Sequence, residues 1–101
     1  MVYENIRNDE DRYQLQTYGK FPISIDSAKG CYVYDGKGGK YLDFYSGHAV
    51  TSTGHCHPHV VNAIQQQTSR LLFYSNVVYS EVRARAAKKL VEMAESPYYQ
   101  A

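Results

Sequence analysis

The sequence contains no tryptophan and no excess of either charge, with 11 basic against 10 acidic residues and a net charge of +1. Proteins that bind nucleic acid need a basic stripe to neutralise the phosphate backbone, and this composition does not provide one. Long apolar runs are also missing, since no stretch of about 18 apolar residues occurs. We therefore expect no nucleic-acid partner and no membrane partner.

The sequence is also poor in cysteine and shows no targeting signal. Residues 1–5 hold neither the basic region nor the apolar run of a secretion signal. Cys31 and Cys56 are the two cysteines, and in a chain without such a signal two cysteines are more often free thiols than a disulfide. These features favour a soluble chain in the cytoplasm.

Three short strands are predicted in the first half of the chain. Apolar and polar residues alternate in residues 21–26 and 31–34, and a third short apolar pattern covers residues 40–44. The connections at 27–30 and 35–39 contain glycine and have the length of hairpin turns. The pattern therefore predicts a small antiparallel meander.

Two amphipathic helices are predicted after these strands. Pro58 suits the first position of a helix, where a missing amide hydrogen costs nothing, and this helix should reach about Leu71. Ser80 can cap the next helix, which should end near residues 96–97. The apolar stripes are Val60, Val61, Ile64, Leu71 and Leu72 in the first helix and Val82, Ala86, Leu90 and Met93 in the second.

A short helix is also predicted before the strands. Asn8 or Asp9 can cap it, because its side-chain oxygen can accept from the first free backbone amides, and the helix should run to Leu15. The fold class is therefore α+β: a short N-terminal helix, a three-stranded antiparallel meander and two helices. Three strands leave two sheet edges open, so we expect the segment to pack on something larger.

A cluster of histidines and a cysteine raises the question of a metal site. His55, Cys56, His57 and His59 lie close together in sequence, with His48 nearby. Zinc sites usually draw ligands from separated pairs that converge, whereas an extended His-Cys-His run points alternate side chains to opposite faces. We therefore assign no metal ligand and expect these histidines to have structural or positioning roles.

Two further motifs resemble catalytic or phosphate-binding sites. Residues 36–40 are rich in glycine and lysine, but Tyr41 and a strand follow, whereas a phosphate loop opens a helix. Cys56 or Ser46 as a nucleophile lacks an evident orienting carboxylate. The small-residue turn at 46–54 is harder to dismiss, because its backbone can approach a ligand closely; a plain connection is the alternative.

Several motifs in order along the whole chain resemble the amino-terminal part of class III aminotransferases, and most of all the acetylornithine and ornithine enzymes. The motifs occupy residues 17–22, residues 30–35 with Gly38, residues 41–44, residues 54–58, and residues 74–76 with Tyr79. The resemblance implies a pyridoxal-phosphate enzyme of fold type I that works as a homodimer. Residues 1–101 then form an amino-terminal segment without the large cofactor-binding domain.

The resemblance implies supporting roles for six residues. Tyr18 matches a tyrosine on the substrate side, and His48 matches a variable position that lines the substrate pocket, with Gly47 and Ala49 as its small neighbours. Ser75 and Asn76 match a loop near the active site of the dimer partner.

The resemblance implies no catalytic residue in this segment. The family's Schiff-base lysine, the aspartate that faces the pyridine nitrogen and the phosphate-binding turn match no position here, and the phosphate turn is expected beyond Ala101. The missing part of the chain is thus expected to bind pyridoxal 5'-phosphate.

The expected reaction moves an amino group from N-acetylornithine, or a similar ω-amino donor, to 2-oxoglutarate. The alternative donors are 4-aminobutyrate, ornithine and succinyl-diaminopimelate. The isolated segment is expected to be inactive. Two alternatives of other classes stay open: a small non-catalytic binding or dimerisation module, and a small zinc protein.

Overall fold

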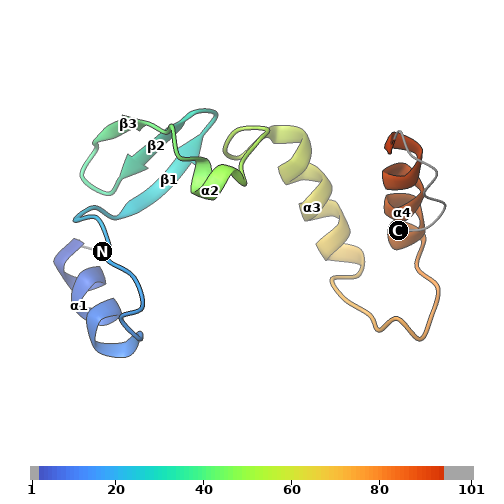
Figure 1. The fold of residues 1–101 in the computed structure, drawn as a ribbon, viewed down its shortest axis with the longest axis horizontal. Helices are drawn as coiled ribbons and strands as arrows, with labels where there is room; N and C mark the ends of the chain where they lie inside the picture. The colour runs from blue at the N-terminus through green and yellow to red at the C-terminus, as the bar shows by residue number, and fades with distance from the viewer. Residues whose placement is uncertain (1–2, 95–101) are drawn as a thin grey trace. The chain divides into compact units, whose positions relative to one another are not determined.

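The computed structural model describes residues 3–94 and has the predicted α+β composition (Figure 1). The chain divides into two units, one up to Gln66 and one from Gln67 onward, and each is described by itself. The elements follow one another as α1 (Tyr3–Tyr13), β1 (Ile25–Lys29), β2 (Tyr32–Asp35), β3 (Lys40–Leu42), α2 (Ser46–Ala49), α3 (Pro58–Arg70) and α4 (Glu81–Met93).

Helix α1 lies earlier in the chain than predicted. Asn8 and Asp9 are inside the helix, so the prediction that one of them caps it was wrong, and Leu15 lies beyond its end. The charges explain why the earlier segment is helical: Glu4 lies in the first turn and Arg12 in the last, where each favours the helix dipole.

The three strands form one antiparallel sheet in the order β1-β2-β3, which confirms the meander (Figure 1). The first strand is displaced, however: β1 covers residues 25–29 instead of 21–26. Lys29 pairs with Tyr32, so the turn contains only Gly30 and Cys31. Gly30 has a φ of +60°, which a two-residue hairpin of this kind requires at its first position. The turn therefore forms at Gly30 itself.

The second hairpin turn is organised by the carboxylate of Asp35. Its Oδ1 accepts the backbone N–H of Lys37 at 2.9 Å and of Gly39 at 2.7 Å, and its Oδ2 accepts the Tyr41 hydroxyl at 2.9 Å. These bonds, the Gly39 amide first, lower the pKa of Asp35. The amides of the glycine-rich segment thus face a carboxylate of their own turn, which confirms a hairpin and not a phosphate loop.

Helices α3 and α4 begin where the sequence predicts. Pro58 is the first residue of α3, which ends at Arg70, one residue before the predicted end. Helix α4 begins after Ser80, whose backbone is extended but whose side chain makes no capping hydrogen bond. It ends at Met93, earlier than predicted, because Ala94 leaves the helical conformation and its N–H bonds the carbonyls near the helix end. Residues 96–97 lie outside the described residues.

No side chain among residues 3–94 is buried, so the apolar stripes have no cover within the described chain. Along α3, Val60 and Ile64 are 40% and 57% exposed, and Phe44 after the sheet is 93% exposed. The predicted amphipathic faces are therefore present and uncovered. In residues 3–94, no helix is both long enough and apolar enough to cross a membrane.

Candidate functional site

A contact between Asp43 and His55 organises the first unit. His55 Nε2 lies 2.6 Å from Asp43 Oδ2, and the side chains are only 19% and 12% exposed respectively. Asp43 Oδ1 accepts the backbone N–H groups of Tyr45 and Ser46, each at 2.9 Å. The His55 hydrogen bond and then the two amides lower the pKa of Asp43. One carboxylate therefore joins the end of β3, the start of α2 and the segment before α3.

The β1–β2 turn fixes the position of both partners. Gly30 and His55 form a two-hydrogen-bond bridge, with N–O distances of 2.9 and 2.8 Å. The Asp43 N–H donates to the Cys31 carbonyl at 2.8 Å. Gly54 has a φ of +83°, and a Cβ there would lie 3.3 Å from Gly30 Cα. Only glycine therefore suits this close approach of two backbones.

The segment held by Asp43 is a single left-handed turn. Ser46, Gly47, His48 and Ala49, labelled α2, have φ angles of 52°, 56°, 62° and 60°. L-residues avoid this conformation, at about 1–2 kcal/mol each, so the three non-glycine residues among these four need outside support. Asp43 gives that support at the start of the turn, and Thr51 donates to the Ser46 carbonyl at its end. Such backbone outliers cluster at functional sites.

The turn joins the rings of Tyr45 and His48. The Tyr45 hydroxyl is hydrogen-bonded to His48 Nε2, and the ring centroids lie 4.7 Å apart with the planes at 58°. Both side chains are exposed, Tyr45 by 60%. The turn therefore presents an ordered pair of polar rings at the surface of the first unit.

The structure brings three of the predicted substrate-side residues together and leaves one apart. Gly47, His48 and Ala49 share the turn. Tyr18 is 83% exposed and lines a separate cavity of about 470 Å³ between α1 and the segment before β1. Among the described residues, Tyr18 makes no hydrogen bond and no ring contact with the turn. Lys20, in the same cavity, is paired with Glu10.

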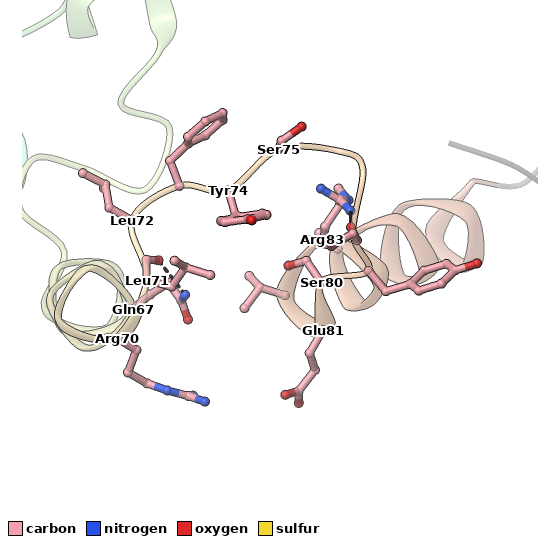
Figure 2. Close-up of a pocket in the computed structure, with 14 residues that line it drawn as sticks. Gln67, Arg70, Leu71, Leu72, Tyr74, Ser75, Ser80, Glu81 and Arg83 are labelled. Atoms are coloured by element: carbon pink, nitrogen blue, oxygen red, sulfur yellow. Dashed lines mark hydrogen bonds between the residues drawn. The ribbon is translucent and has the colours of Figure 1, made fainter.

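The predicted loop residues Ser75 and Asn76 lie in the second unit, where Arg83 of α4 is hydrogen-bonded to Asn76. Arg83 donates from Nη1 to Asn76 Oδ1 at 2.8 Å and from Nη2 to the Val78 carbonyl. The Val77 N–H donates to Ser75 Oγ at 3.4 Å. Figure 2 shows Ser75 on the connecting loop with its hydroxyl pointing away from a cavity of about 710 Å³. Arg83 is thus the positioning residue for this loop.

Sequence reasoning missed the roles of Asp43, Tyr45 and Arg83. Asp43 lies in the motif at residues 41–44, but its partner His55 lies twelve residues away. A negative residue just before a turn of small residues is a weak signal that it accepts the amides of that turn. No local pattern predicts the Arg83 contact.

The histidine and cysteine cluster does not gather into a metal centre in the described chain. Among residues 3–94, no group of three or more His, Cys, Asp or Glu side chains has an arrangement that could hold a metal ion. Cys31 and Cys56 are free and exposed. His55 is instead hydrogen-bonded to Asp43, a contact of the kind expected for a positioning residue.

The cavity of the first unit that combines a lysine, a carboxylate and a tyrosine does not fit a pyridoxal-phosphate site. Such a site needs a free lysine amine, a carboxylate for the pyridine nitrogen and amides for the phosphate. A cavity of about 500 Å³ is lined by Asp35, Lys37 and Tyr41, but both oxygens of the Asp35 carboxylate are already engaged within its own turn. We therefore assign no cofactor-binding residue within residues 3–94.

Comparison with known proteins supports one family along most of the chain. The family model "Aminotransferase class-III" matches residues 13–98. An acetylornithine aminotransferase from Methanocaldococcus jannaschii is 46% identical over 94 residues, which cover 93% of this chain and 24% of that protein. The chain therefore spans about a quarter of the length of this curated relative.

Solved structures agree with the sequence match. Ornithine δ-aminotransferase from Plasmodium falciparum superposes with a TM-score of 0.90 at 27% identity, over 99% of this chain and 26% of that one. A taurine:2-oxoglutarate aminotransferase from Bifidobacterium kashiwanohense, in complex with PLP and glutamate, gives a TM-score of 0.84 at 30% identity, over 94% and 22%. This chain belongs to the class III aminotransferases, a family of pyridoxal-phosphate-dependent enzymes.

Proposed function

We propose that this chain is the amino-terminal segment of a longer pyridoxal-phosphate-dependent transaminase, which moves an amino group from N-acetylornithine to 2-oxoglutarate. The 46% identity to an acetylornithine aminotransferase across 93% of the chain is the observation that carries this proposal. The full-length enzyme works as a homodimer. Free Cys31 and Cys56 fit a reducing compartment, so we place it in the cytoplasm.

In this proposal the left-handed turn forms one wall of the substrate site. Gly47 and Ala49 are small enough to let the donor approach the backbone, and His48 adds a polar ring. The strain of the turn and its anchoring by Asp43 support a functional role. Tyr18 contributes a hydroxyl on the substrate side.

The second unit contributes a loop in the same proposal. Ser75 and Asn76 belong to the loop that approaches the active site of the partner subunit, and Arg83 keeps this loop in one conformation. Bound pyridoxal phosphate supplies the electron sink for transamination. In this proposal the residues of the segment bind and position the substrate, and the rest of the enzyme binds the cofactor. The segment alone therefore has no transaminase activity.

The test is an assay of the full-length enzyme supplied with pyridoxal phosphate. Glutamate formation from 2-oxoglutarate is measured with N-acetylornithine, ornithine, 4-aminobutyrate and succinyl-diaminopimelate in parallel. We expect kcat/KM to be highest for N-acetylornithine and the segment 1–101 to match the blank. A different best donor would overturn the substrate assignment, and no glutamate with any donor would overturn the reaction.

A second candidate is a non-catalytic binding or dimerisation module made of this segment alone. The uncovered apolar side chains, such as Phe44 at 93% and Phe73 at 80% exposure, are the observation that favours it. Sequencing the gene beyond the Ala101 codon separates the two. An open frame that continues supports the transaminase, whereas a stop codon together with cooperative unfolding of residues 1–101 supports the module.

A further inference from the structure

We infer that Tyr45 fixes the tautomer of His48, so that His48 Nδ1–H is a hydrogen-bond donor for an acyl or carboxylate oxygen on the amino donor. Tyr45 is then a positioning residue and His48 a specificity-determining residue. This inference rests on the proposed function, because it takes the left-handed turn as a wall of the substrate site. It adds the chemical reason why an acylated donor is preferred.

Hydrogen bonds fix both the backbone and the hydroxyl of Tyr45 in its pair with His48. The Tyr45 N–H donates to Asp43 Oδ1 at 2.9 Å, which fixes the backbone of Tyr45. Its hydroxyl bonds His48 Nε2, and the two rings lie 4.7 Å apart. Because Asp43 is also bonded to His55, the orientation of His48 depends on a continuous chain of contacts from the body of the first unit.

The chemistry of the two rings sets the direction of their hydrogen bond. In a neutral imidazole one nitrogen is a donor and the other an acceptor. The contact joins the Tyr45 hydroxyl to His48 Nε2. A phenol hydroxyl is a good donor, whereas its oxygen lone pair is partly delocalised into the ring, so we infer that the Tyr45 O–H is the donor and His48 Nε2 the acceptor. The proton of the imidazole then lies on Nδ1, because the bond at one ring nitrogen decides the state of the other.

The second ring nitrogen is available to a ligand. Among residues 3–94, Tyr45 is the single hydrogen-bond partner that the structure gives the His48 side chain. Since His48 is exposed, Nδ1–H can donate to an oxygen brought against the turn. A donor at this place accepts an amide or carboxylate oxygen and is unsuited to an ammonium group, which has only donors to offer.

This chemistry distinguishes the two closest candidate substrates. N-acetylornithine carries an acyl oxygen on its α-nitrogen, whereas ornithine carries an ammonium group there. Contact with Nδ1–H therefore favours the acylated donor. Without the Tyr45 hydroxyl, the imidazole proton can move to Nε2, Nδ1 becomes an acceptor in part of the molecules, and the preference weakens.

The test compares wild-type full-length holoenzyme with Tyr45→Phe, which removes one oxygen atom. We expect KM for N-acetylornithine to rise about 3- to 10-fold, the effect of one neutral hydrogen bond, with kcat and the KM for ornithine changed less than about twofold. Tyr32→Phe, which removes a tyrosine hydroxyl from β2, is the matched control and should leave both KM values unchanged.

A second readout reports the tautomer directly and needs no activity. In enzyme labelled with ¹⁵N-histidine, the His48 resonances should show protonated Nδ1 and unprotonated Nε2 in the wild type, and a mixture in Tyr45→Phe. A wild-type proton on Nε2, or a Tyr45→Phe enzyme with unchanged tautomer and unchanged KM values, would overturn the inference. If the wild type transaminates no donor, the proposed function fails and the substrate part of the inference with it, whereas the tautomer is still decided by the spectrum.

Discussion

His55 Nε2 lies 2.6 Å from Asp43 Oδ2 and closes the segment between them into a loop. That loop contains the left-handed turn at 46–49. The amides of Tyr45, just before the turn, and of Ser46, its first residue, donate to the other oxygen of the same carboxylate. A single aspartate therefore couples the position of His55 to the conformation of the turn. The geometry of the proposed substrate wall depends on this pair more than on any local propensity.

Acid should weaken this part of the structure through Asp43. Its pKa is below the ordinary value of 3.8 in the folded protein, so the folded state binds fewer protons than the unfolded state near that pH. The stabilisation is complete well above pH 3.8 and is lost as the pH falls through the lowered pKa. At neutral pH, the wild-type full-length enzyme should unfold at a higher temperature than Asp43→Asn. This difference in unfolding temperature should shrink below pH 3.8. A difference in unfolding temperature that stays constant across this range would contradict this stabilising role of Asp43.

Replacing Gly54 should destabilise the bridge between Gly30 and His55. The φ of +83° is unfavourable for alanine, and its Cβ would crowd the Gly30 backbone at 3.3 Å. We expect Gly54→Ala to lower the free energy of unfolding by about 1–3 kcal/mol. Gly36→Ala is the control, because a Cβ there meets open space without a positive φ. Denaturant unfolding of the full-length enzyme measures the free energy of unfolding of both variants. Equal stability of the two variants would contradict a stabilising role for the bridge between Gly30 and His55.

Removing Arg83 should loosen the loop that holds Ser75 and Asn76. Arg83→Ala deletes the hydrogen bonds to Asn76 Oδ1 and the Val78 carbonyl. We expect faster hydrogen exchange in residues 75–79 of the full-length enzyme, with little change elsewhere. Arg85→Ala removes an exposed arginine of the same helix, whose partner Glu81 lies 3.8 Å away, and should leave the loop unaffected. Unchanged exchange in Arg83→Ala would show that other contacts hold the loop.

The sequence predicts the elements whose causes are local. Pro58 marks the start of α3 because its ring suits the first helical position, and Asp35 with its glycines forms the expected hairpin turn. Alternation alone predicts the first hairpin too early in the chain, because it does not show where a positive φ is needed. Gly30 decides that point, and its role becomes visible only when Lys29 is paired with Tyr32.

The candidate site is only partly predictable for the same reason. The resemblance singles out Gly47, His48 and Ala49, and the structure does place them in one turn. The left-handed conformation of that turn has no sequence signature, since three of its four residues are not glycine. The conformation of the turn depends on Asp43. The position of Asp43 and its lowered pKa depend in turn on His55, twelve residues later. Contacts of that separation do not appear in local patterns.

We expect the left-handed turn at 46–49 to line the substrate site of a transaminase. A crystal structure of the full-length enzyme with pyridoxal phosphate and an unreactive analogue of N-acetylornithine tests it most directly. We expect positive φ angles at 46–49 and a hydrogen bond of about 2.7–3.2 Å from His48 Nδ1 to the acyl oxygen. A bound analogue with no atom of residues 46–49 within about 4 Å would contradict it.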